Sequence, residues 1–201
     1  MPVQPHVHAV ELDDTFDFIN TLEHDGDAST EELETPGAAI AWLVGRGLVH
    51  ADSIPAQRAS DERLLARVLH ARAAFREIAD AVHGHRPADA AALDEVNRTL
   101  RAREVVLLEP ASDGVSVGHR HEGDPIDDAL ARLAEPLVAE IASGRPDRLR
   151  VCANDACRWV FFDHSPTGRR RWCSMRSCGN RAKAARHRER MKDAASGGAP
   201  G

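Results

Sequence analysis

The chain has 201 residues, a formal net charge of −6, 42 % hydrophobic residues and 29 % charged residues. This is enough for one medium-sized domain, or for one domain and a small module. No apolar run approaches the ~20 residues that a membrane-spanning helix needs, and the N-terminal residues lack the basic and apolar segments of a secretory signal. We therefore expect a cytoplasmic protein with no membrane partner.

The first elements are predicted to be helical. The periodicity of apolar residues places a helix over about 13–22. The acidic stretch 24–34 is expected to form a polar loop. A second helix should begin at Pro36, which suits the first helical position, with Thr35 as its N-cap, and it should end at Gly45 or Gly47.

The clearest helical pattern lies further along the chain. Residues 60–83 show apolar residues at a period of 3.6, with Ser60 as the expected N-cap and Gly84 as the expected end. A shorter helix is predicted at about 87–102. Next, two runs of β-prone residues flank "PASDG", which predicts a β-hairpin.

A last N-terminal helix is predicted in "DPIDDALARLAEPLVAEIASG", with a kink at Pro136. The fold class that follows is mainly α with one β-hairpin (α+β). It combines a multihelical N-terminal domain with a smaller C-terminal unit. No catalytic set of residues can be recognised in the helical part, so we do not expect an enzyme.

The charge of the chain changes sign near residue 148. Residues 1–147 carry 13 Arg, no Lys and 28 Asp or Glu, a net charge of −15. Residues 148–201 carry 13 Lys or Arg and 4 Asp or Glu, a net charge of +9. This step predicts a boundary between an acidic helical domain, 1–147, and a basic unit, 148–192. A disordered tail is expected at 193–201.

The basic unit holds every cysteine of the chain, in the pattern C-x4-C-x15-C-x4-C. In a reducing compartment two such pairs favour one tetrahedral Zn²⁺ site over disulfides, an iron–sulfur cluster or buried free thiols. Four thiolates leave no open position for water, so the zinc should be structural. The predicted ligands are Cys152, Cys157, Cys173 and Cys178.

The segments around the cysteines predict a treble-clef-like zinc finger. "RLRVC" and "RWVFFDH" are typical of two short strands, and the second cysteine pair should open a helix that runs to about Met191. Metal would then replace the hydrophobic core that so few residues cannot build. The aromatic residues are expected around the metal site, Asp163 and Asn180 are expected to brace its loops, and His164 is not needed as a ligand.

The sequence resembles a known family at these residues. "WCSMRSCGNRAK", which contains "CGNR" at 178–181, is similar to the signature of the bacterial CGNR zinc-finger proteins. "FDFINTL" at 16–22 is similar to the motif that opens the ABATE domain, which usually precedes this finger. The resemblance implies a stress-linked transcription regulator that binds DNA.

Basic side chains crowd the finger, and arginine suits both phosphate oxygens and the guanine edge. The prediction is a DNA-binding transcription regulator acting on duplex DNA, with an N-terminal domain that senses a small-molecule or protein ligand or serves in assembly. One alternative is binding of RNA or single strands; another is an adaptor whose finger docks on an acidic partner or on its own N-terminal domain. The candidate nucleic-acid contacts are Arg169, Arg170, Arg171, Arg176, Arg181, Lys183, Arg186, Arg188 and Arg190.

Overall fold

The computed structural model describes residues 10–103, 105–112, 114–120, 123–144 and 146–196. Short 3-10 turns link some of the elements, and a π-helical turn, Met175–Gly179, precedes the last helix. None of the helices in these ranges combines the length and apolar character needed to cross a bilayer. The elements are α1 (Leu12–Ile19), β1 (Leu22–Asp25), β2 (Ala28–Glu31), α2 (Pro36–Gly45), α3 (Glu62–His83), α4 (Ala90–Leu100), β3 (Val105–Ala111), β4 (Gly114–Arg120), α5 (Pro125–Ala142), β5 (Leu149–Val151), β6 (Val160–Phe162) and α6 (Asn180–Ser196).

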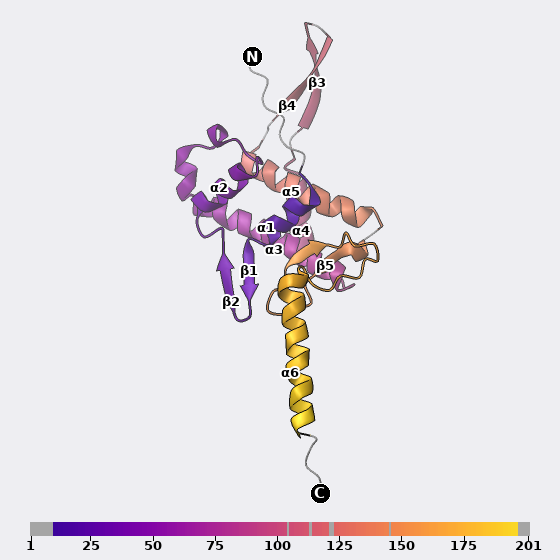
Figure 1. Ribbon diagram of the computed structural model, residues 1–201. Coiled ribbons are helices and arrows are strands. Elements are labelled where there is room, and N and C mark those ends of the chain that lie inside the picture. The colour runs from indigo at the N-terminus through magenta and orange to yellow at the C-terminus, as the bar shows by residue number, and fades with distance from the viewer. Residues whose placement is uncertain (1–9, 104, 113, 121–122, 145, 197–201) are drawn as a thin grey trace.

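Helices form the centre of the molecule. The long helix α3 packs against α1, α2, α4 and α5, while β3 and β4 form a hairpin that projects from the body (Figure 1). Phe18 and Phe75 are fully buried between α1 and α3, and their rings meet edge to face. The mostly helical fold with small hairpins confirms the predicted class.

Most helix ends follow the local sequence. The side chain of Thr35 accepts a hydrogen bond from the Ala38 amide at the start of α2, as predicted. The N-cap of α3 is Asp61 and not Ser60, because the Asp61 carboxylate accepts hydrogen bonds from the amides of Arg63 and Leu64. At its C-terminal end α6 continues to Ser196, past the predicted end at Met191.

Residues 193–196 therefore form the last turn of α6, within the stretch predicted as a disordered tail. The rest of that predicted tail, 197–201, lies outside the described residues.

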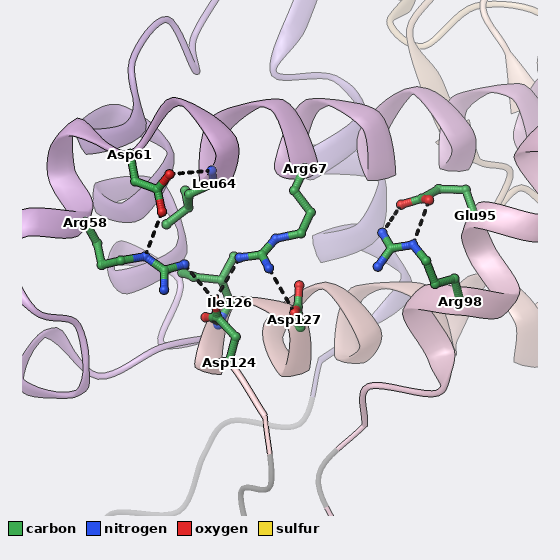
Figure 2. A network of polar contacts seen from close by, with 9 residues as sticks. All are labelled: Arg58, Asp61, Leu64, Arg67, Glu95, Arg98, Asp124, Ile126 and Asp127. Atoms are coloured by element: carbon green, nitrogen blue, oxygen red, sulfur yellow. Dashed lines mark hydrogen bonds and ion pairs between the residues drawn. The ribbon is translucent and has the colours of Figure 1, made fainter.

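The start of α5 is held by a network of ion pairs (Figure 2). Its N-cap, Asp124, accepts a hydrogen bond from the Ile126 amide and pairs with the guanidinium groups of Arg58 and Arg67. Arg67 also reaches Asp127, 3.1 Å away. Two arginines from other elements thus fix the point where α5 enters the bundle.

A second hairpin corrects the sequence analysis. The stretch 24–34, expected to be a polar loop, contributes to the antiparallel pair β1–β2, with Leu22 opposite Glu31 and Asp25 opposite Ala28. Gly26 takes a φ of 67° in the turn, a conformation that glycine adopts without strain. The two turn residues, Gly26 and Asp27, are a recognised hairpin signal, but Thr30 is the single β-branched residue in the two strands.

An ion pair anchors this hairpin to α3. The guanidinium of Arg72, which is buried, donates hydrogen bonds to both carboxylate oxygens of Glu31 and to the hydroxyl of Thr21. Burial raises the pKa of Glu31, but the hydrogen bonds from Arg72 and from the Leu33 amide, with the charge of Arg72, outweigh it. The net pKa lies below the usual 4.5.

We expect the stability of the protein to fall on acidification through this pair. A lowered folded-state pKa gives stability that is present above pH 4.5 and is lost as the pH falls through the folded value. The variant Glu31→Gln should be less stable than the wild type at pH 7, and its free energy of unfolding should fall less between pH 5 and pH 3. Urea unfolding at several pH values measures this, with the exposed neighbour Glu32→Gln as control. Equal pH profiles for Glu31→Gln and wild type would contradict it.

The C-terminal strands join the main core. Leu149 of β5 and Val160 of β6 are fully buried in the same cluster as the helices, with β5 against α3 and β6 against α1. The amide side chain of Asn20, buried after α1, donates to the Val160 carbonyl and accepts from the Val160 amide, both at 2.9 Å. The change of charge at 148 therefore does not coincide with a gap in the hydrophobic core.

Candidate metal centre and basic helix

The four cysteines come from three short segments. Cys152 directly follows β5, and Cys157 lies in the turn that leads towards β6. Cys173 precedes the π-helical turn Met175–Gly179, and Cys178 lies within that turn. The first two segments are tied together by the backbone, because the Cys152 amide donates to the carbonyl of Trp159 at 2.9 Å. The folding of the hairpin thus brings separated cysteines to one place.

The sulfur atoms form a compact cluster. All four Sγ atoms lie within 4.8 Å of one another. Cys173 Sγ is 3.7 Å from that of Cys157 and 3.9 Å from that of Cys178. A tetrahedron with Zn–S bonds of about 2.3 Å has edges of about 3.8 Å, whereas a disulfide would bring two sulfurs to about 2.0 Å. The cysteines are free thiols in positions that fit one structural zinc ion.

Without a cation, ionisation is unfavourable for two of the four thiols. Burial raises the pKa of Cys157 to about 11, and burial with the neighbouring sulfurs raises that of Cys173 further. Burial also acts to raise the pKa of Cys178, but hydrogen bonds from Asn154 and the other cysteines lower it to about 7. Four thiolates this close repel one another, and a divalent ion removes that repulsion.

Comparison with known families decides the classification. The sequence pattern of the CGNR zinc finger matches residues 148–191. The pattern of the ABATE family, described as "Putative stress-induced transcription regulator", matches residues 15–144. The chain belongs to the ABATE family. No curated protein gives a significant match to it.

Aromatic rings surround the metal centre of this ABATE-family protein, as expected. Phe161 is buried beside Cys152 and Cys178, and Trp159 and Trp172 pack against the same cluster. Phe162, by contrast, packs against the main core, with the ring of His164 4.9 Å from its own. These contacts account for the aromatic residues without a nucleic-acid partner.

Polar groups around the cysteines differ in part from those predicted. Asn154, which the sequence analysis did not single out, places its side-chain nitrogen 3.5 Å from Cys178 Sγ. Its position in the sequence between Cys152 and Cys157 could have indicated this contact. Asn180 donates to the Arg176 carbonyl. Gly179 leaves room for Met175, because a Cβ there would lie 2.8 Å from its sulfur.

Asp163 braces the loop that carries three of the predicted arginines. Its carboxylate is fully buried and accepts hydrogen bonds from the amides of Ser165, at 2.9 Å, and Arg170, at 2.7 Å. From the other side, the guanidinium of Arg148 donates to the carbonyls of Asp163 and Ser165, both at 2.8 Å. The loop is therefore fixed at both ends and leads directly into Cys173.

The structure places all nine predicted basic residues at the surface, on this loop, the π-helical turn and α6. Four of them have side-chain contacts within the described part of the chain, and the weakest is the 3.4 Å hydrogen bond from Arg186 to the Ala182 carbonyl one turn before it. Arg170 stacks over Phe161 and donates to the Cys173 carbonyl, and Arg171 lies over the ring of Trp172. The guanidinium of Arg181 approaches Asp25 of the β1–β2 hairpin at 3.2 Å.

The acidic hairpin also touches the finger through its backbone. The Gly26 amide donates to the Ala156 carbonyl at 3.0 Å. On α3, a carboxylate oxygen of Asp80 lies 3.7 Å from a guanidinium nitrogen of Arg158 and 3.0 Å from one of Arg76. Attraction between the acidic body and the basic finger is thus present at the base of the finger, while α6 extends away from the body (Figure 1).

Proposed function

We propose that this protein binds duplex DNA through the basic finger, residues 148–191, and regulates transcription in this way. The observation that carries the proposal is the group of nine exposed basic residues on a unit held by a cysteine cluster. The whole chain has a net charge of −6, so the positive charge is concentrated on this one surface. Phosphate groups are the partners that such a surface attracts most strongly.

The acidic body favours one orientation on the nucleic acid. Residues 1–147 carry a net charge of −15, so phosphates repel them. The finger then approaches the duplex first, with α6 pointing away from the body. The helical domain remains free to bind a ligand or a second protein, and binding there would change how the finger is presented.

The aromatic residues favour a duplex over single strands. Proteins that bind single strands stack bases on exposed aromatic rings. In this finger Trp159 and Trp172 are half-buried against the cysteine cluster, and Arg171 covers one face of Trp172. Basic side chains along a helix, in contrast, suit the backbone and grooves of double-stranded DNA.

The adaptor alternative has specific support in two contacts. Arg181 pairs with Asp25, and Arg158 lies near Asp80. Both pairs lie where the finger meets the body, and they engage one of the nine candidate residues. We therefore infer that docking on the acidic body fixes the finger, and that the remaining basic surface serves an external polyanion.

Paired arginine variants test the proposal. The double variant Arg186→Ala with Arg190→Ala should bind a random duplex more weakly at 100 mM salt. Its log–log salt slope should be smaller by about 1.8, because each phosphate contact contributes about 0.9. The control is Arg63→Ala with Arg101→Ala, which removes the same charge from exposed positions in α3 and after α4. Fluorescence anisotropy of a labelled duplex measures both; equal losses in the two double variants would contradict the proposal.

A further inference from the structure

Helix α6 has almost no support from its own protein. It extends away from the body after the π-helical turn Met175–Gly179 (Figure 1). Its main packing contact is with that turn, and the ion pair from Arg181 to Asp25 joins its first turn to β1. None of the side chains described over 180–191 is buried. At 1.5 Å per residue its 17 residues span about 25 Å. A helix that is polar all round and exposed along its length gains stability from a partner.

The five basic residues of α6 between 181 and 190 fall into two rows. At 100° per residue, Lys183, Arg186 and Arg190 share one side of the helix, and Arg181 and Arg188 share another. The two rows lie on either side of a narrow front face, the first at about 100° and the second at about 77° from it around the helix axis.

The front face between the rows carries no arginine, lysine or acidic residue. It consists of Ala184, His187 and Met191, all of which are exposed. The opposite face carries Ala182 and Ala185, which are half-buried. This front face therefore forms a stripe without arginine, lysine or acidic residues, with a basic row on each side. The arrangement differs from a helix that is uniformly basic.

The spacing of these features matches one groove of DNA. The major groove is about 12 Å wide and is lined on both sides by phosphates. A helix with its side chains is about 10–12 Å across. With the stripe towards the groove floor, each basic row faces one phosphate strand. Alanine and methionine suit the thymine methyl group, and the imidazole of His187 suits a purine edge.

We propose that α6 lies in the major groove of duplex DNA with Ala184, His187 and Met191 towards the base edges, and that the two basic rows contact the two phosphate strands. The inference rests on the proposed function and adds which surface reads sequence. Arginines of the rows then set the salt dependence, and the stripe sets the preference for particular base pairs.

A matched pair of neighbouring substitutions tests this assignment in the zinc-loaded full chain. Ala184→Gln and Ala185→Gln make the same chemical change on the front and back of the helix. Bound sequences are selected from a random duplex library for each variant and for His187→Ala. Ala184→Gln and His187→Ala should change the selected sequences, lowering affinity for the wild-type choice by roughly 5- to 150-fold, the range for one lost base contact. Their salt slopes should stay unchanged, and Ala185→Gln should select as the wild type does.

Chemical modification of the DNA gives a second readout without protein variants. Methylation of guanine N7, which lies in the major groove, should block binding of the wild-type chain, whereas methylation of adenine N3 in the minor groove should not. The assignment would be overturned if Ala184→Gln and His187→Ala both selected the same sequences as the wild type. It would also be overturned if methylation of adenine N3, and not of guanine N7, blocked binding. A wild-type chain with no salt-dependent affinity for any duplex would instead overturn the proposed function itself.

Discussion

Replacing Cys173 with serine is expected to remove zinc from the protein and unfold the segment around it. The wild type should hold about one zinc ion per chain, bound by four thiolates, whereas serine supplies no thiolate. The cluster beside the metal has three buried members, Cys152, Phe161 and Cys178. Such a small cluster cannot replace a structural ion whose binding contributes about 10–16 kcal/mol in isolated zinc fingers.

Elemental analysis and limited proteolysis measure this effect. The Cys173→Ser protein should contain little zinc and should be cleaved rapidly between residues 152 and 180, with its helical circular dichroism largely kept. His164→Ala is the control, because His164 is exposed and lies outside the cysteine cluster. It should retain one zinc. Full zinc content and unchanged proteolysis in Cys173→Ser would disprove the assignment of the metal site.

The variant Asn20→Ala should lower the stability of the whole protein. Its amide is the buried link between the end of α1 and β6, with two hydrogen bonds to the backbone of Val160. Alanine leaves one buried amide and one buried carbonyl without partners, at about 1–3 kcal/mol each. We expect a loss of about 2–5 kcal/mol in the free energy of unfolding, and a fall in Tm of roughly 5–15 °C for a chain of this size.

Urea and thermal unfolding test this, with zinc bound throughout. The control is Asn97→Ala, an exposed amide in α4, which should change stability by less than about 0.5 kcal/mol. If Asn20→Ala unfolds at the same temperature as the wild type, the strands of the finger do not share the core with the helices.

The features that could be predicted from the sequence are those that depend on local patterns. The apolar period, the Thr35 cap and the cysteine spacing are short-range signals, and the structure confirms the helices and the clustered cysteines that they predict. The resemblance at "CGNR" and "FDFINTL" is confirmed by the two family matches. In each case neighbouring residues carry the information.

The contacts that escaped the sequence analysis join distant parts of the chain. The bonds between Asn20 and Val160 connect residues 140 positions apart, and those between Arg72 and Glu31 connect α3 to a hairpin that looked like a loop. No periodicity marks such pairs. The change of charge at 148 indicated separate units, yet Leu149 is buried with the helices.

This shared core bears on the predicted independence of the two parts. The division into 1–147 and 148–192 remains a prediction based on charge. A fragment that ends at 147 would lose the packing of β5 on α3 and of β6 on α1. The full chain is therefore the right material for binding experiments, with single charges altered in place.

A salt titration of duplex binding by the zinc-loaded full chain tests the central claim most directly. A labelled random duplex is titrated at salt concentrations from 50 to 200 mM, before and after removal of zinc with a chelator. The account predicts a linear fall of log affinity with log salt, with a slope of about −0.9 for each phosphate contacted, and loss of binding when zinc is removed. An affinity that is absent at 50 mM salt, or that is the same with and without zinc, would contradict it.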